Sequence, residues 1–312
     1  MNIQQFHYIL AVAELKHFES AAAKCCVSQS TLSTMISKFE DEIEIKIFDR
    51  SKKPVALTIE GSIILEQLKI ISNDIDQLLE ITKEIKGEVS GKLNLSVITT
   101  IAPFLLPLFL QDFALQFPEL NIVVKEETTE EILKKIKSRE IDIGIVSIPL
   151  IDKEIFEIKL YDEPFVYYDA LNISKGNVSI KSNISERICL MDEGHCMRTQ
   201  MLELCNLSKK KLKSVLNIEY KAGSIDGLTR FVKSNKLTTL LPYLSVLNFT
   251  KDESKYVSVF ESPTPYRTVG LIVNRHFVKR RILDKLKFKI IEKVSEHLPS
   301  INSEGQLLSP KE

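Results

Sequence analysis

The chain has 312 residues, enough for about two domains, and its 44% hydrophobic and 27% charged residues are typical of an ordinary globular protein. Lysine plus arginine and aspartate plus glutamate each number 42, so the overall charge does not indicate a polyanionic partner. The five cysteines are too few and too unevenly spaced for a disulfide framework, and they lack the CxxC pairs of a zinc site. We therefore expect neither a disulfide framework nor a metal, and no cofactor.

The N-terminal residues argue against export, and the length of the apolar stretches argues against membrane insertion. The first residues, Met-Asn-Ile-Gln-Gln, contain neither a basic stretch nor an apolar segment, unlike a secretory signal. The longest apolar stretch, 101–110, contains Pro103 and Pro107 and is shorter than the roughly 20 residues that cross a bilayer. We therefore predict a cytoplasmic protein with no membrane contact.

The first 42 residues have the pattern of three helices. Apolar residues from Ile3 to Ala13 recur at helical spacing, and residues 20–26 form a short alanine-rich segment. Ser28 is a good N-cap for a helix that ends near Glu42. A short helix, a tight turn and a helix whose first turn carries Gln, Ser and Thr is the helix-turn-helix pattern, in which that first turn enters the major groove of DNA. The candidate DNA contacts on this helix are Ser28, Gln29, Ser30, Thr31 and Ser33.

The segment 48–58 is typical of a small basic hairpin, or wing. Residues 1–60 contain one more acidic than basic residue, which argues mildly against DNA binding and leaves a purely dimerising helical domain as an alternative. Placement matters more than the sum, because phosphate affinity depends on the cations that face the backbone. The basic residues that fall near the recognition helix and wing are Lys38, Arg50, Lys52 and Lys53.

Thr58 is the expected N-cap of a long helix that runs to about Ile85. Its apolar residues approximate the heptad spacing of a coiled coil, and a single helix cannot bury such a stripe. We therefore expect a homodimer that binds two DNA half-sites. The stripe consists of Ile63, Ile64, Leu68, Ile71, Ile75, Leu78, Leu79, Ile81 and Ile85.

Beyond residue 91, short β-rich segments alternate with helical ones, which indicates an α/β sheet with crossover helices. The tail beyond Pro299 is expected to be frayed. The expected strands are 93–97, 120–124, 141–146, 187–191, 216–220, 238–241 and 268–273, and the expected helices are 104–117, 130–138 and 278–294.

The segment from Asp192 to Arg198 places Cys196 between an imidazole, His195, and a guanidinium, Arg198. Nearby positive charge favours the thiolate, the form of cysteine that reacts with oxidants. Good helix formers follow, so we expect a helix that begins near Cys196. Cys205 lies nine residues further on, a rise of about 13.5 Å on a helix, whereas a disulfide needs Cα atoms within about 7 Å. If the two cysteines ever bond, the segment must refold, as in a redox switch.

A simpler interpretation is that these cysteines are apolar filler, since free cysteine is among the most buried residue types and disulfides are rare in the cytosol. We assign that role to Cys189, which lies within an apolar strand pattern and is expected to be buried and inert. Packing is also the expected role of Cys25 and Cys26, at the end of the second helix.

One ordered set of residues runs through the N-terminal unit: Phe18, Ala21, Ala22, Val27, Ser28, Gln29, Ser30, Leu32, Ser33, Ile36, Phe39, Glu40, Phe48, Arg50, Leu57, Thr58 and Gly61. It resembles the winged helix-turn-helix of LysR-type transcriptional regulators. The resemblance covers essentially the full chain and implies an α+β protein. It also implies operator DNA and RNA polymerase as partners, and a homodimer or a dimer of dimers.

By that resemblance the regulatory domain is similar to a periplasmic binding protein, with two α/β subdomains and a cleft between them. The implied boundaries are a winged helix-turn-helix over 1–60, a linker and dimerisation helix over 58–88 and a regulatory domain over 91–300. Subdomain I would comprise about 91–163 and 269–300, and subdomain II about 164–268.

The sequence from Leu190 to Arg198, with Cys205, further resembles the peroxide sensors of the OxyR class. The resemblance implies that Cys196 is the peroxidatic thiol, oxidised first to sulfenic acid, and that Cys205 resolves it into a disulfide. A thiol reductant would reset the switch. Thr199 stands where this class usually has an aspartate. The residues implied to line the peroxide pocket are Thr100, Thr129, His195 and Arg267. The resemblance also implies that Arg267 stabilises the thiolate and the leaving hydroxide.

We therefore predict a transcription activator of the oxidative-stress response, not an enzyme, that senses hydrogen peroxide through Cys196 and Cys205. The first alternative keeps DNA binding but makes the signal a small organic effector and both cysteines structural. The second alternative, a thiol peroxidase, is disfavoured by the helix-turn-helix and by the lack of a recognisable reductant-docking motif.

Overall fold

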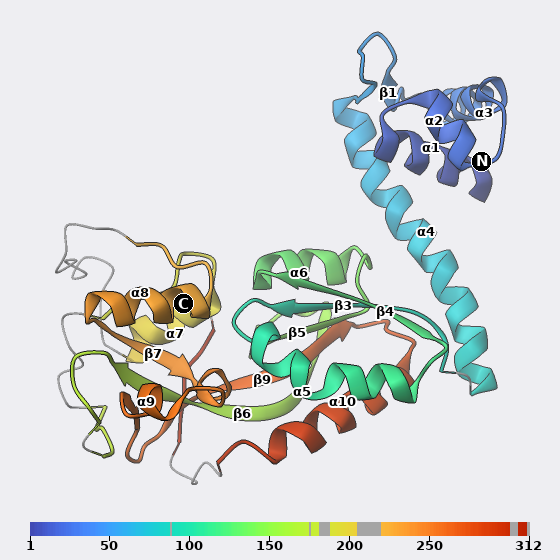
Figure 1. The fold of residues 1–312 in the computed structure, drawn as a ribbon. Coiled ribbons are helices and arrows are strands. Elements are labelled where there is room, and N and C mark those ends of the chain that lie inside the picture. The colour runs from blue at the N-terminus through green and yellow to red at the C-terminus, as the bar shows by residue number, and fades with distance from the viewer. Residues whose placement is uncertain (88, 175, 181–187, 205–219, 300–304, 311–312) are drawn as a thin grey trace. The chain divides into compact units, whose positions relative to one another are not determined.

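The structure is a computed structural model that describes the whole chain except residues 88, 175, 181–187, 205–219, 300–304 and 311–312. The chain divides into two compact units, residues 1–86 with 138–140, and residues 87–137 with 141–312. Each unit is described by itself (Figure 1). Within the described residues, no helix has the length and apolar character needed to span a membrane.

The N-terminal unit is a helix-turn-helix followed by a two-stranded wing. Its elements are α1 (Ile3–Leu15), α2 (Phe18–Lys24), α3 (Gln29–Glu42), β1 (Phe48–Asp49), β2 (Ala56–Leu57) and α4 (Ile59–Lys86). The predicted N-caps are confirmed: the Ser28 hydroxyl accepts the Thr31 N–H at 3.1 Å, and the Thr58 hydroxyl accepts the Gly61 N–H at 2.8 Å. These local hydrogen bonds fix where α3 and α4 begin.

The core of this unit is formed by one face each of α1, α2 and α3, with Ile47 and Phe48 before the wing. Gly61 is required at the start of α4, because a Cβ there would collide with the Ile47 carbonyl. Cys25 packs against this core as expected. The prediction for Cys26 is wrong: it is exposed, with a φ of 56°, because the turn after α2 directs its side chain outward.

The apolar stripe of α4 is only partly covered within one chain. Leu68 is buried and Ile64 and Ile71 pack against the N-terminal core, whereas Ile63 and Ile85 are exposed, at 68% and 77%. Leu78 is exposed as well. The uncovered residues extend along α4, as the coiled-coil spacing predicts.

The C-terminal unit is built on an eight-stranded sheet whose main order is β4-β3-β5-β9-β6-β7, with β8 paired to β6 and β10 to β9. Its first half contains β3 (Gly91–Ile98), α5 (Ala102–Gln116), β4 (Leu120–Glu127), α6 (Thr129–Lys137) and β5 (Ile143–Ile148). β3 pairs in parallel with β4 and β5, the arrangement expected from strand–helix–strand repeats. α10 (Arg280–Ser295) packs on α5.

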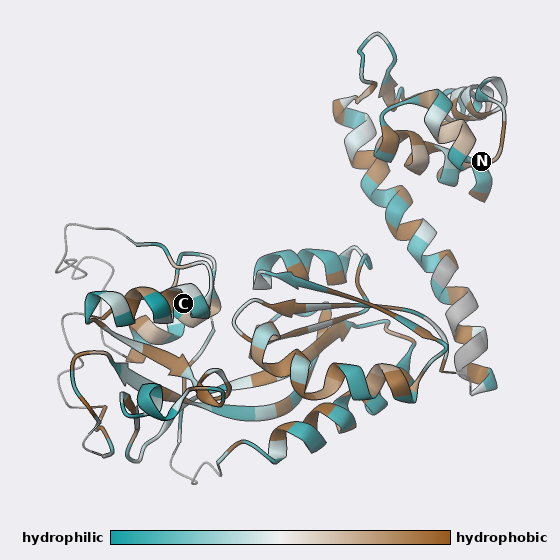
Figure 2. Cartoon of the chain, in the orientation of Figure 1, coloured by the Kyte–Doolittle hydropathy of each residue, from teal (hydrophilic) through white to brown (hydrophobic). Residues whose placement is uncertain are grey.

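The second half contains α7 (Cys196–Leu204), α8 (Ile225–Asn235), β7 (Thr238–Pro242), the 3₁₀ helix η1 (Tyr243–Val246), α9 (Lys251–Ser254) and β8 (Val257–Val259). β6 (Ile155–Asp169) and β9 (Pro265–Asn274) are long paired antiparallel strands; β6 contributes to both hydrophobic cores of the unit, and β9 contributes to the first. β5 and β9 carry mostly hydrophobic residues, whereas hydrophilic and hydrophobic residues alternate along α8 (Figure 2). β6 and β9 therefore connect the two halves.

The expected positions of strands and helices agree with the structure over most of the first half, and depart from it in the second. The segment 188–191 forms only isolated bridges, of Ile188 with Thr238 and of Met191 with Ala222. Residues 187 and 216–219 of two expected strands, and Cys205, lie outside the described residues. Neither β6 nor α8 was predicted.

The tail was expected to be frayed, and that prediction is wrong for residues 305–310. β10 (Gln306–Leu307) pairs in parallel with the start of β9, and Leu308 is fully buried in the second core. The Leu308 N–H donates to the Tyr266 carbonyl at 2.9 Å, and the Leu308 carbonyl accepts from Gln200 of α7 at 3.0 Å. β10 has two residues, too few to show a periodic pattern in the sequence, so its order follows from its pairing with β9.

Candidate functional site

The first candidate site is the exposed face of α3 and the wing. Gln29, Ser30, Thr31 and Lys38 are exposed on α3, and Lys52 and Lys53 are exposed in the wing. The Ser28 hydroxyl is occupied as the N-cap and is also within hydrogen-bond distance of the Ser30 and Thr31 hydroxyls. The first turn of α3 thus presents a connected row of hydroxyl groups, which suits base edges and phosphates alike.

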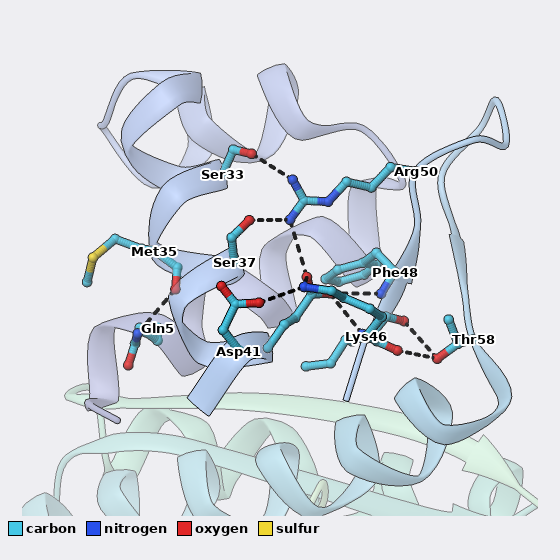
Figure 3. Close-up of polar contacts among 11 residues, drawn as sticks. Gln5, Ser33, Met35, Ser37, Asp41, Lys46, Phe48, Arg50 and Thr58 are labelled. Atoms are coloured by element: carbon cyan, nitrogen blue, oxygen red, sulfur yellow. Dashed lines mark hydrogen bonds and ion pairs between the residues drawn. The ribbon is translucent and has the colours of Figure 1, made fainter. Parts of the chain in front are cut away.

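Arg50 connects the wing to α3 rather than extending away from it (Figure 3). Its guanidinium donates to the Ser33 hydroxyl at 2.9 Å and to the Ser37 hydroxyl at 3.0 Å, and it lies 4.9 Å from the centre of the Phe18 ring. The guanidinium is also 3.4 Å from the carboxylate of Glu40. A phosphate at this face would compete with hydroxyl groups for Arg50.

Glu40 is one of the residues that resemble the LysR-type helix-turn-helix, but the sequence predicted no role for it. Its carboxylate is buried and accepts the N–H groups of Ile47 and Phe48, at 2.8 and 3.2 Å. It thereby holds the entry of the wing against α3. An unpaired buried N–H costs free energy, so this carboxylate stabilises the position of the wing.

The second candidate site surrounds Cys196, the first residue of α7. Gly194, with a φ of 91°, makes the turn that leads into the helix. Cys196 is buried and contributes to the first core, and one side of it lines a cavity of about 260 Å³. The residues that line this cavity are Thr129, Glu130, Leu133, Leu150, Gly194, His195, Cys196, Thr199 and Pro310. Thr129 and His195 thus line this cavity together with Cys196.

The electrostatics of the thiol differ from what the sequence neighbours of Cys196 indicate. Burial raises the pKa of Cys196, and the Arg267 charge and a hydrogen bond with the Thr129 side chain partly oppose that shift. Burial lowers the pKa of His195, which favours a neutral imidazole, although Asp192 opposes this. Arg198 donates to the Met191 carbonyl at 2.7 Å. The cation that favours the thiolate is thus Arg267, not the sequence neighbours of Cys196.

The other two predicted pocket residues, Arg267 and Thr100, are both buried and are hydrogen-bonded to each other. Arg267 Nη1 donates to the Thr100 hydroxyl and Arg267 Nη2 to the Thr100 carbonyl, both at 3.1 Å. Neither residue is among those that line the cavity. The structure therefore places Thr100 against the guanidinium, with Arg267 acting on the thiol through its charge.

Sequence reasoning overlooked four residues around this site. The Thr99 hydroxyl lies 3.2 Å from His195 Nδ1, and Glu163 forms a buried ion pair with Arg267. Gln200, one helical turn after Cys196, and Pro310 link α7 and the cavity to the tail. Only Thr99 had a sequence signal, as the neighbour of Thr100.

Two other cysteines also have pKa values raised by burial. Cys189 is half-buried and packs against the second core, and burial raises its pKa. Burial also raises the pKa of Cys25. Across the part of the chain that the structure describes, no group of three or more His, Cys, Asp or Glu residues could hold a metal.

Comparison with known proteins agrees with this geometry. The model of the bacterial regulatory helix-turn-helix protein, lysR family, matches residues 3–62, and the LysR substrate binding domain matches residues 86–284. The chain belongs to the LysR family. The predicted α+β fold, a helix-turn-helix followed by a two-part α/β domain, is therefore confirmed.

Several relatives are OxyR proteins. A hydrogen peroxide-inducible genes activator of Pectobacterium carotovorum is 30% identical over 87% of this chain and 90% of its own. The DNA-binding transcriptional dual regulator OxyR of Escherichia coli K12 is 28% identical over 96% of this chain and 98% of its own. A full-length OxyR variant from Pseudomonas aeruginosa has a TM-score of 0.74 and 27% identity, covering 93% of this chain and 98% of its own. The predicted resemblance to the OxyR class is thereby confirmed.

Proposed function

We propose that this protein is a peroxide-responsive activator of transcription in which Cys196 is oxidised first and Cys205 then closes a disulfide. The observation that carries the proposal is the Cys196 thiol itself. It sits at the start of a helix, lines a small cavity and lies within the field of a buried guanidinium, Arg267. The names of the OxyR relatives support the same signal.

The chemistry balances with these two thiols and one peroxide. Cys196 Sγ attacks one peroxide oxygen, the O–O bond breaks, and a sulfenic acid and water result. Cys205 then attacks the sulfenic sulfur, an S–S bond forms, and a second water leaves. Burial raises the pKa of Cys196, so the resting thiol is protected, and the Arg267 charge and Thr129 favour the reactive thiolate.

The observed helix must break for the second step to occur. α7 runs from Cys196 to Leu204, and Cys205 follows directly. From Cys196 to Leu204 the helix rises about 12 Å, whereas a disulfide needs Cα atoms within about 7 Å, so a bond from Cys196 to the residue that follows Leu204 requires α7 to unwind. Oxidation would therefore unwind α7 and repack the regulatory domain, and so change the spacing of two DNA-binding units in a dimer formed through α4. Operator DNA, RNA polymerase and a reducing thiol are the partners of this cycle.

The test is intact mass with thiol alkylation before and after one equivalent of hydrogen peroxide, followed by peptide mapping. We expect a fast loss of two alkylatable thiols, mapped to a Cys196–Cys205 bond, and its absence in Cys196→Ser. Cys189→Ser, which changes a half-buried cysteine of the same unit, is the matched control and should behave as the wild type.

Retention of both thiols would contradict the proposal and favour a small organic effector in the cavity. Loss of peroxide-dependent promoter activation in Cys196→Ser completes the test.

A further inference from the structure

A buried ion pair joins the two long strands of the C-terminal unit. Glu163 on β6 and Arg267 on β9 are direct cross-strand partners, and their side chains are 0% and 1% exposed. Glu163 Oε2 accepts from Arg267 Nε at 2.9 Å and lies 2.8 Å from Nη2. Two contacts on one edge of a planar guanidinium set both its position and its tilt.

The same pair reaches both halves of the unit. The other carboxylate oxygen of Glu163 accepts the Leu244 N–H of η1 at 2.9 Å. The opposite edge of Arg267 donates to Thr100, in the turn between β3 and α5. The guanidinium therefore lies between an anionic anchor from β6 and a neutral one from the β3–α5 turn.

A count of donors shows what this arrangement leaves for chemistry. A guanidinium has five N–H groups. Nε donates to Glu163, Nη2 faces Glu163 and the Thr100 carbonyl, and one N–H of Nη1 is taken by the Thr100 hydroxyl. Among the residues that the structure describes, no partner takes the second N–H of Nη1. Its direction follows from the plane that Glu163 imposes.

We propose that Glu163 is a positioning residue for the oxidation of Cys196, because it orients Arg267 so that one Nη1 N–H stays available to the thiolate and to the departing hydroxide. The inference rests on the proposed function and extends it to a residue that does not line the cavity. The carboxylate also opposes the Arg267 charge at the thiol, so Glu163 has two separable effects. It improves the geometry of the reaction and disfavours the thiolate.

The two effects predict changes of opposite sign in Glu163→Gln, measured in the full-length chain with Cys205→Ser so that only the first step occurs. Removing the negative charge should lower the pH midpoint of Cys196 alkylation by iodoacetamide. Loosening Arg267 should slow sulfenic acid formation at least tenfold, measured by dimedone trapping at a pH where the thiolate is fully formed. A purely structural role would move neither quantity in a chain that remains folded.

Asp162→Asn is the matched control. Asp162 is the preceding residue of β6, and its carboxylate accepts from the Thr268 hydroxyl of β9 at 2.7 Å, so it also links the two strands without contacting Arg267. We expect both the alkylation midpoint and the peroxide rate to match those of the wild type.

Glu163→Asp keeps the negative charge but has a side chain shorter by one methylene. It is the variant to measure if Glu163→Gln does not fold. We expect an alkylation midpoint near that of the wild type with a reduced peroxide rate. A folded Glu163→Gln or Glu163→Asp variant with a rate within twofold of the wild type overturns the inference and leaves the proposed function standing. If wild-type Cys196 is not oxidised by peroxide, both fall together.

Discussion

Replacing Leu308 by alanine tests whether the tail is part of the folded domain. Leu308 is 0% exposed in the second core, whereas its neighbour Leu307 is 41% exposed. Leucine-to-alanine changes in cores cost about 2–5 kcal/mol, depending on how far the site collapses. The short segment 305–310 near the chain end can adjust, so we expect a loss of about 2 kcal/mol for Leu308→Ala, the lower end of that range. In a domain of this size that is a shift in melting temperature of roughly 4–8 °C.

The same change should loosen α7. The Leu308 carbonyl accepts from Gln200, and the Ser309 N–H donates to Glu203 at 3.1 Å, so the tail contacts two successive turns of the helix that bears Cys196. We expect faster amide hydrogen exchange in the α7 peptide of the reduced Leu308→Ala protein.

Thermal unfolding and hydrogen exchange on the full-length reduced chain provide the measurement, with Leu307→Ala as the matched control. The control should lie within about 0.5 kcal/mol of the wild type, as surface substitutions do. If the two variants melt at the same temperature and exchange alike, the tail contributes nothing to the core, and the reasoning is refuted.

Three further predictions concern the two candidate sites. Glu40→Ala leaves two buried N–H groups without their acceptor and should destabilise the N-terminal unit by about 2–4 kcal/mol in chemical denaturation. The control Glu42→Ala, at an exposed position of α3, should cost less than about 1 kcal/mol. Equal losses of stability in the two variants would contradict the role of Glu40. Arg50→Ala should weaken operator binding and reduce the salt slope by about 1 if Arg50 exchanges its hydroxyl partners for a phosphate, and an unchanged slope in fluorescence anisotropy titrations would exclude that exchange. Burial raises the pKa of Cys196 above its ordinary value of 9.0, so the protonated thiol dominates at neutral pH. The rate of Cys196 alkylation should therefore rise about tenfold per pH unit up to at least pH 9. A plateau below pH 8 in peptide-mapped alkylation would show a lowered pKa instead.

The N-terminal unit could be predicted well because its determinants are local. The Ser28 and Thr58 hydroxyls cap α3 and α4 by accepting N–H groups only three residues further along the chain. The spacing of apolar residues in α1 and α3 marks the buried face of each helix. The start of α7 at Cys196 was predicted for the same reason. Local hydrogen bonding and periodicity need no knowledge of the partner surface.

The partners of Cys196 could not be predicted from its neighbours. A helix directs residues two positions apart to different sides, so Arg198 contacts the Met191 carbonyl while Arg267, from β9, provides the positive charge. Nothing near Arg267 in the sequence indicates that Glu163, 104 residues earlier, is its partner. β6 was missed because it passes from one core to the other, so its buried positions follow no single alternating pattern.

By itself, the sequence determined the helix-turn-helix, the long α4, the α/β character of the C-terminal unit and the start of a helix at Cys196, because caps, periodicity and motif order are contained within short windows of sequence. The tertiary structure alone decided which carboxylate holds Arg267 and where residues 305–310 lie. These features depend on the register of β6 against β9 and of β10 against β9. Strand register is set by packing between distant segments, which no local window contains.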